Sequence, residues 1–203
     1  MGCLEASKEP MQADELEGIL AFLQRTERLK TTMRSGWTSA GRTESVAEHT
    51  WRLCLMAMVL YDGAPGINMA RLLKMCLIHD LGEAIGGDIP APSQASGAPK
   101  AEQERADLLQ LVSPLSPAIQ AHIVELWDEY EGASTAEARL AKGLDKLETI
   151  LQHTQGKNPD GFDYSYNLTY GKPYTAADPV LAALRTRLDQ ETARLAHESE
   201  GAR

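Results

Sequence analysis

Residues 44–60 read ESVAEHTWRLCLMAMVL, a stretch that combines a helix start with a polar side chain on an apolar face. Ser45 and Glu48 stand in the S-x-x-E spacing of a capping box, so we expect a helix to begin here. Its inward face repeats at helical spacing through His49, Leu53, Met56 and Leu60. Glycines at positions 63 and 66 predict its end. An imidazole therefore lies on the core side of this helix.

The next stretch, NMARLLKMCLIHDLGE over residues 68–83, again combines a helix start with polar side chains on an apolar face. Asn68 can cap a helix. One stripe of that helix holds Leu72, Cys76, His79 and Glu83, and the adjoining stripe holds Leu73, Leu77 and Asp80. The spacing predicts one helix whose last turn carries polar residues at the end of an otherwise apolar face.

The rest of the chain predicts an all-α fold. Apolar residues at helical spacing indicate five more helices. The first is capped by Asp14 and carries Leu16, Ile19, Leu20 and Leu23, and the second covers 100–112. The third begins at Ser116 and Pro117 and carries Ile119, Ile123, Leu126, Trp127 and Tyr130. The fourth begins near Ser134 and carries Leu140, Leu144, Leu147 and Leu151, and the fifth begins at Asp178 and Pro179 and carries Leu181, Leu184, Leu188 and Leu195. Residues 32–43 and 86–99 are expected to be loops, and no strand-like alternation stands out.

The length sets the domain organisation. At 203 residues the chain suits one domain with its own core. We expect a single bundle of about six to eight helices over residues 1–203. Its core should run from about residue 14 to 197, with 1–12 and 198–203 as frayed tails.

Residues 155–177 resist a helical interpretation. They contain five of the chain's aromatic residues: Phe162, Tyr164, Tyr166, Tyr170 and Tyr174. A long segment without regular structure is usually functional or disordered, and so many aromatic side chains argue against disorder. We expect this segment to pack over a site, a partner subunit, or both.

Composition excludes several classes of function. Acidic residues outnumber basic ones by 29 to 20, giving a net charge of -9, which argues against nucleic-acid polymers and anionic membranes as partners. No apolar stretch reaches the roughly 18 residues of a membrane span. The three cysteines are an odd number without CxxC spacing, which favours free thiols in a reducing compartment. We therefore expect a cytoplasmic protein.

Four polar residues on or beside apolar stripes suggest a metal site: His49, His79, Asp80 and Asp145. Burying such groups is costly unless they find partners, and one divalent cation satisfies all four. Two imidazoles and two carboxylates suit Mn²⁺, Co²⁺, Fe²⁺ or Zn²⁺. Taken singly, each histidine is better interpreted as a hydrogen-bonded core residue than as a metal ligand.

The order and spacing of four motifs decide between these interpretations: Glu44-Ser-Val-Ala-Glu-His49, His79-Asp80-Leu-Gly-Glu83, Gly87-Asp88-Ile89 and Leu144-Asp145-Lys-Leu-Glu148. Together they resemble the HD-domain metal-dependent phosphohydrolases, in the branch of YfbR-like 5′-deoxynucleotidases and the HD domain-containing protein 2 group. The resemblance runs from about Arg34 to Gln152. It implies metal binding by His49, His79, Asp80 and Asp145, an all-helical fold and a homodimer. Members of that family that hold two metals use additional histidines between the His-Asp pair and the last Asp. Only His122 lies in that interval here, so the resemblance implies a single metal.

The resemblance also implies roles for residues around the metal. Glu83 would orient or deprotonate a water, and an acid near a helix C-terminus, which opposes the helix dipole, favours a functional role there. Asp88 would contact the sugar or the hydrogen-bond network, although a turn aspartate after two glycines is the competing interpretation. In the stretch Arg-Ser-Gly-Trp, Arg34 would contact the phosphate and Trp37 would contact the base or sugar. The competing interpretations are that Arg34 is solvated and that Trp37 packs on the core.

Residues near these motifs receive lesser roles. The capping box accounts for Glu48, which is therefore a poor ligand candidate. Glu148 lies one turn beyond Asp145 and can support a ligand, whereas Lys146 is interpreted as solvated. His153 is at best a substrate-side residue, and His122 is expected at the surface.

The leading hypothesis is a phosphomonoesterase that hydrolyses (deoxy)nucleoside 5′-monophosphates to nucleoside and phosphate, with one divalent metal. A phosphohydrolase or phosphodiesterase acting on another phosphorylated metabolite is an alternative on the same site. A non-catalytic scaffold or binding dimer stabilised by a metal is the alternative of another class, and Glu83 counts against it.

Overall fold

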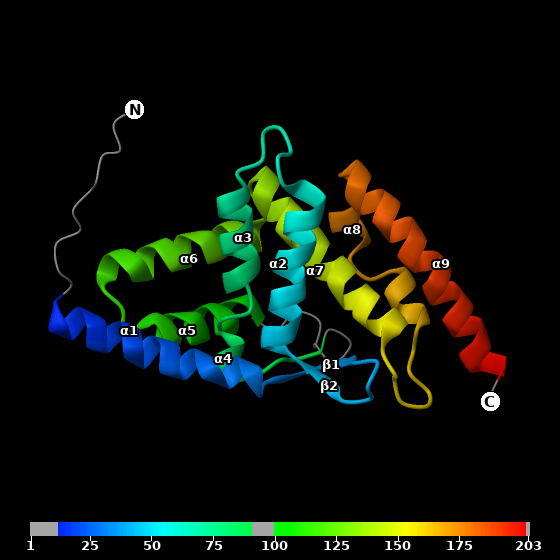
Figure 1. Ribbon diagram of the computed structural model, residues 1–203, viewed down its shortest axis with the longest axis horizontal. Helices are drawn as coiled ribbons and strands as arrows, with labels where there is room; N and C mark the ends of the chain where they lie inside the picture. The colour runs from blue at the N-terminus through cyan, green and yellow to red at the C-terminus, as the bar shows by residue number, and fades with distance from the viewer. Residues whose placement is uncertain (1–11, 91–99, 202–203) are drawn as a thin grey trace.

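A long central helix organises the fold. The computed structural model describes residues 12–90 and 100–201. Within them α7 (Ala136–Gln155) contacts α2, α3, α6, α8 and α9, and its start is capped by Thr135, whose side chain accepts the Ala138 N–H. Leu140, Leu144, Leu147 and Ile150 on α7 are buried. The all-α prediction is confirmed, and α7 is the element against which these five helices pack (Figure 1).

The two helices predicted from local signals pack together against α7. Helix α2 (Val46–Tyr61) begins with both hydrogen bonds of the capping box between Ser45 and Glu48. Helix α3 (Met69–Ile78) begins at Asn68, whose side chain accepts the Arg71 N–H. The predicted starts are thus confirmed, because a cap needs only residues that are neighbours in sequence.

The predicted continuation of the second helix to Glu83 is wrong. The α-helix stops at Ile78, and the short helix α4 (Glu83–Gly86) follows after a turn. The carbonyl of His79 accepts the indole N–H of Trp127 from α6 at 3.1 Å, while the Glu83 N–H turns to the Asp80 carbonyl. Glu83 therefore lies at the start of a helix and not at the end of one. The start is the end at which the helix dipole favours a carboxylate.

The expected loop over residues 32–43 contains a small sheet. Strand β1 (Met33–Trp37) pairs antiparallel with β2 (Thr43–Ser45), with Met33 opposite Ser45 and Trp37 opposite Thr43. The expectation of no strands is corrected here, because strands this short leave no readable alternation. Since β2 runs directly into α2, the hairpin holds Arg34 beside the start of the helix that carries His49.

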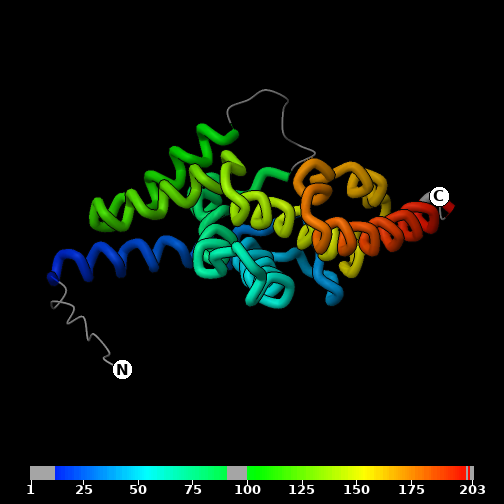
Figure 2. Tube along the Cα trace, turned by 90° about the horizontal axis from the view of Figure 1, so that it is seen from above, coloured from blue at the N-terminus to red at the C-terminus, as the bar shows by residue number. Residues whose placement is uncertain are grey.

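Helix α1 (Ala13–Thr26) is present, but its apolar face is not buried as predicted. Leu16, Leu20 and Leu23 are each about half exposed, at 49%, 49% and 55%. The helix starts after Gln12, not at Asp14. It lies at one end of the long axis, opposite α9 (Pro179–Gly201), in both views (Figures 1 and 2). At the edge of the bundle few elements are available to cover it.

Helices α5 (Lys100–Val112) and α6 (Pro117–Gly132) agree with the bounds expected from the spacing of apolar residues. Helix α6 begins with Pro117 in its first turn. Residues 155–177 hold a 3-10 turn (Ser165–Leu168) and the one-turn helix α8 (Lys172–Thr175). Of the predicted tails, residues 1–11 and 202–203 lie outside the described residues, whereas residues 198–201 belong to α9, which continues to Gly201.

Candidate metal centre

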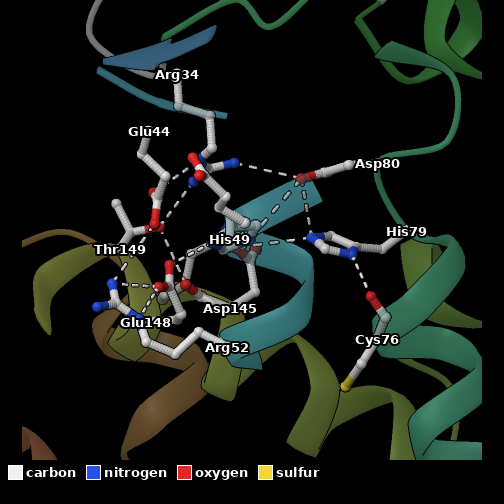
Figure 3. Close-up of polar contacts among 12 residues, drawn as sticks. Arg34, Glu44, His49, Arg52, Cys76, His79, Asp80, Asp145, Glu148 and Thr149 are labelled. Carbon is white, nitrogen blue, oxygen red and sulfur yellow. Dashed lines mark hydrogen bonds and ion pairs between the residues drawn. The ribbon is translucent and has the colours of Figure 1, made fainter. Parts of the chain in front are cut away.

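Two buried imidazoles face each other at the junction of α2, α3 and α7 (Figure 3). The ring centroids of His49 and His79 are 5.5 Å apart, and both side chains are at most 1% exposed. His79 Nδ1 contacts the Cys76 carbonyl at 2.8 Å, and His49 Nδ1 contacts the Glu148 carboxylate. In both rings Nε2 is buried and has no hydrogen-bond partner among the described residues. With Nδ1 carrying the proton, each Nε2 presents a lone pair to the space between the rings.

Two carboxylates face the same space. Asp80 Oδ2 lies 3.1 Å from His79 Nε2 and 3.9 Å from His49 Nε2, and Asp145 Oδ1 lies 3.3 Å from His49 Nε2. The structure thus brings together all four predicted ligands, from α2, the turn after α3, and α7. Single oxygen and nitrogen atoms of His49, His79 and Asp145 lie within 4.8 Å of one another.

These residues fit a divalent cation. The two buried Nε2 lone pairs without partners lie beside two carboxylates. A positive charge between these groups would therefore stabilise them. The electrostatics agree: burial and Arg34 lower the pKa of His49, but Glu148 and Asp145 outweigh them and raise it to about 9. Without a cation, the raised pKa favours a second proton on His49, at Nε2, which would supply that charge. A divalent ion bound between the four groups would replace the proton.

A network of charges behind His49 holds it in place. Glu148, which is fully buried, accepts from His49 Nδ1 and from Arg52 Nε at 2.6 Å. Arg52 also lies 3.7 Å from Glu44. Glu44, His49 and Glu148 form a second group of metal-ligating type, but arginine side chains neutralise its carboxylates. Glu148 thus orients the imidazole of His49, the supporting role that its sequence position suggested. The sequence did not indicate the role of Arg52.

Glu83 is a buried carboxyl that faces the site. Its Oε2 has no hydrogen-bond partner in the part of the chain that the structure describes. Burial and repulsion from Asp80 and Asp88 raise the pKa of Glu83 to about 10. Burial also raises the pKa of Asp88. Both side chains line the same cavity as Asp80 and Asp145, so both predicted residues lie at the site.

Two cations flank the ligand carboxylates. Arg34 donates from Nη1 to Asp80 Oδ2 at 3.3 Å and from Nη2 to Thr149 Oγ1 at 3.1 Å. Lys146 donates to Asp145 Oδ2 at 2.7 Å and lies 5.3 Å from the Tyr170 ring. The expectation that Lys146 is solvated is wrong, because Tyr170 covers it and its side chain is only 23% exposed.

A cavity of about 430 Å³ opens beside the four ligands, a volume typical of small-molecule sites. Helix α7 lines it with Asp145, Lys146, Thr149 and His153, and the aromatic segment contributes Phe162, Tyr166, Asn167 and Tyr170. The aromatic segment thus packs over the candidate site, which is one of the alternatives expected for residues 155–177. His153 also reaches the cavity, as a substrate-side residue would.

Other candidates lie elsewhere. Trp37 is not among the described residues that line the cavity; its carbonyl accepts from Gln152 on α7. Glu48 pairs with Arg42 and completes the capping box. His122 is exposed and contacts Lys74 at 3.3 Å. The surface assignment of His122 and the capping role of Glu48 are confirmed.

Sequence reasoning missed three residues that shape the site. Tyr130 donates to Asp145 Oδ2 at 3.0 Å, Arg52 holds Glu148, and Asn167 lies fully buried at the cavity. The positions of Arg52 and Glu148, each one turn beyond a predicted ligand on the same helix, were a usable signal. Nothing local distinguishes Tyr130 or Asn167.

Comparison with known proteins places this arrangement in a family. A family profile described as HD domain matches residues 26–185. The chain is 33% identical to the 5′-deoxynucleotidase HDDC2 of Danio rerio, over 88% of this chain and 90% of that protein. It is 40% identical to the 5′-deoxynucleotidase hdd1 of Schizosaccharomyces pombe, over 70% and 74% of the two chains.

A solved structure agrees in fold. The crystal structure of a predicted metal-dependent phosphohydrolase from Magnetospirillum magnetotacticum superposes with a TM-score of 0.78 at 31% identity, covering 91% of this chain and 96% of that one. Together with the paired imidazoles and carboxylates, these likenesses establish that the chain belongs to the HD domain family.

Proposed function

We propose that this protein is a metal-dependent phosphomonoesterase that hydrolyses (deoxy)nucleoside 5′-monophosphates to nucleoside and phosphate. One observation carries the proposal: buried imidazole nitrogens without partners among the described residues face Asp80 and Asp145 beside a cavity that also presents cationic side chains. Relatives named 5′-deoxynucleotidases support the choice of substrate.

The four ligands we propose are His49, His79, Asp80 and Asp145. Their mixed nitrogen and oxygen donors suit one Mn²⁺, Co²⁺, Fe²⁺ or Zn²⁺ ion. Bound there, a divalent ion supplies polarisation of a phosphoryl oxygen and lowers the pKa of a water molecule. The protein supplies the fixed ligand geometry, because Glu148 and the Cys76 carbonyl hold the two rings.

Glu83 is placed to handle the proton. Its buried oxygen without a partner among the described residues, together with its raised pKa, supports a role for this carboxyl in proton transfer. Positive charge added near Asp80 lowers that pKa, because it favours the charged form and offsets the neighbouring carboxylates. Glu83 can then accept a proton from the attacking water, while Asp88 in the same cavity wall hydrogen-bonds substrate.

Arg34 and Lys146 are placed to bind the phosphate. Both line the cavity, and each lies against one of the ligand carboxylates. A guanidinium offers two parallel donors to phosphate oxygens, and an ammonium adds a point charge. Their charges offset the negative charge that develops on phosphorus oxygens during attack. We keep Trp37 as a proposed contact of the nucleotide outside the cavity lining.

The test measures phosphate release from a panel of ribo- and deoxynucleoside 5′-monophosphates after chelation and after restoring individual metals. We expect release that depends on metal, and Glu83→Gln should lower kcat by at least ~100-fold while metal binding is retained. Glu129→Gln, a carboxyl paired with Arg71 away from the cavity, is the matched control. A protein that binds metal but releases no phosphate from any nucleotide contradicts the proposal, and activity on diesters or other phosphoesters alone would assign the alternative substrate class.

We also propose a homodimer. Helix α2 exposes an apolar stripe of Trp51, Leu55, Met58 and Val59, with exposures from 42% to 77%. Isolated apolar residues at a surface are ordinary, but a stripe along one helix is typical of an interface. Sedimentation should show a dimer that Val59→Glu converts to monomer; a wild-type monomer at micromolar concentration contradicts this.

We place the protein in the cytoplasm. Cys54 and Cys76 are free thiols, which suits a reducing compartment. No helix in the described part of the chain is both long and apolar enough to cross a membrane.

A further inference from the structure

One buried amide at the cavity lacks a hydrogen-bond partner. Asn167 is 0% exposed, and its Oδ1 accepts from His153 Nδ1 at 3.0 Å. Its Nδ2 has no partner among the residues that the structure describes, yet the residue lines the cavity. A buried donor without an acceptor is unfavourable, so the position favours a ligand that supplies one.

Aromatic rings line the same cavity as this amide. Phe162 packs edge-on against His153 and Tyr164, with centroid separations of 4.9 Å in both pairs. Phe162 and Tyr166 both line the cavity with Asn167. Flat apolar rings beside one polar donor form a surface suited to a flat heteroaromatic group with hydrogen-bond acceptors.

The segment is held rigidly. Arg185 of α9, only 5% exposed, donates to the Asn167 carbonyl at 2.7 Å and to the Tyr170 carbonyl at 2.5 Å. Asp189 accepts from Arg185 Nε at 2.6 Å and fixes its orientation. The amide and the rings are thus positioned before any ligand arrives, which reduces the entropy lost on binding.

The amide contacts His153, which lies about two helical turns along α7 from the proposed ligand Asp145. Asp145 and His153 both line the cavity and are eight residues apart on one helix, a rise of about 12 Å. Thr149 lines the cavity between them. A ligand with phosphate at Asp145 and a base at His153 and Asn167 would extend along this helix.

We propose that Asn167, Phe162 and Tyr166 form the subsite that binds the nucleobase. Asn167 Nδ2 donates a hydrogen bond to a carbonyl oxygen or ring nitrogen of the base, and the two rings pack against its faces. This inference rests on the proposed nucleotidase function and assigns its selectivity for nucleotides over other phosphomonoesters. Because every common base carries an acceptor, the subsite recognises nucleosides as a class.

The first experiment compares the 5′-monophosphates of the four common deoxynucleosides with 2-deoxyribose 5-phosphate, which has the same sugar and phosphate but no base. In Asn167→Ala we expect KM for the nucleotides to rise by ~10-fold, the scale of one lost hydrogen bond with some lost packing. The kcat/KM for 2-deoxyribose 5-phosphate should stay within about twofold of wild type, because the metal end of the cavity is unchanged.

Asn158→Ala is the matched control. Asn158 belongs to the same segment and donates to the His153 carbonyl at 2.6 Å and to Tyr164 Oη at 3.0 Å, but it is not among the described cavity-lining residues. We expect its nucleotide KM to match wild type. Equal losses in Asn158→Ala and Asn167→Ala would overturn the proposal, because they would reflect general loosening of the segment.

A second readout does not depend on turnover. Calorimetric titration with free deoxynucleosides reports the subsite alone, and Asn167→Ala should weaken binding by ~10-fold. Asn167→Asp keeps the shape and the acceptor for His153 but removes the donor, so it should weaken binding equally even if the alanine variant does not fold. Wild-type affinity in either folded variant overturns the subsite. If wild type hydrolyses 2-deoxyribose 5-phosphate and no nucleotide, the proposed function itself has failed.

Discussion

At the scale of single residues, Asp145 shows how one carboxylate serves two purposes. Its Oδ2 accepts from Tyr130 at 3.0 Å and from Lys146 at 2.7 Å, while its Oδ1 faces His49 Nε2. One oxygen is therefore anchored by protein donors, and the other remains directed at the ligand space. The donors are supplied by α6 and α7, so the orientation of Asp145 depends on their packing.

Lys146 should contact the substrate phosphate. We predict that Lys146→Met raises KM for phosphomonoesters by ~10-fold or more, the scale of a lost charged hydrogen bond, with a smaller effect on metal affinity. The inhibition constant of inorganic phosphate should rise in parallel. Lys142→Met is the control, since Lys142 lies one turn earlier on α7 and pairs with Glu131 at 2.8 Å. Equal phosphate inhibition in Lys146→Met and wild type would contradict the assignment.

Glu148 should control metal affinity through His49. Glu148→Gln keeps the shape but removes the charge that polarises the imidazole and balances Arg52. We predict a loss of metal affinity of about 10–100-fold, as measured by calorimetric titration. Glu129→Gln, the carboxyl variant remote from the site, should bind metal as wild type does. Unchanged affinity in Glu148→Gln would mean that packing alone positions the ring.

At the scale of elements, local chemistry predicts where helices begin better than where they end. The caps at Ser45 and Asn68 depend on side chains within three residues and could be identified in the sequence. The end of α3 depends on the indole of Trp127, which is 48 residues from His79 in the chain. Such an interaction exists only after α6 has packed, so no local pattern signals it.

The start of α2 should make stability depend on acid. Hydrogen bonding to Arg42 and to Ser45 lowers the pKa of Glu48 to about 2, from an ordinary value of 4.5. Because the folded-state pKa is depressed, the stabilisation is present above about pH 4.5 and is lost as pH falls toward 2. Glu48→Gln keeps a capping side chain without the charge.

We expect wild type to exceed Glu48→Gln in free energy of unfolding by about 1 kcal/mol or less at pH 7, since the group is partly exposed and screened. The difference should vanish near pH 2. Chemical denaturation of both proteins across this range tests the prediction, and a gap that is independent of pH would refute it.

At the scale of the whole molecule, the metal ligands join three separate parts of the chain. His49, His79 and Asp145 come from α2, the end of α3, and α7. A cation that binds only the folded protein stabilises it by about 2.7 kcal/mol at a concentration of 100 times Kd. For a chain of this size we predict a rise in Tm of about 5–10 °C over the chelated protein.

Differential scanning fluorimetry with and without chelator measures this shift. Asp145→Ala removes one ligand and should abolish the dependence of Tm on metal. The same metal-induced rise in Asp145→Ala as in wild type would contradict the proposed ligand set.

The fold class and the meeting of the four ligands followed from helical spacing and from the family resemblance. What the sequence could not provide were features set by long-range packing: the hairpin beside α2, the covering of Lys146 by Tyr170, and the exposure of Leu20 on α1. Each depends on which elements are neighbours in space. Helical periodicity reports an apolar face, but it does not report whether another element covers that face.

Helix α7 fixes the separation of the residues that it contributes to the cavity lining. The spacing between Asp145 and His153 is set by helical rise, with no hinge between them. Inserting or deleting one residue in that interval would rotate everything beyond it by about 100° and remove His153 from the wall. A change in the length of this interval should therefore be more disruptive than a substitution at a position such as Ile150, which is buried in the core instead of lining the cavity.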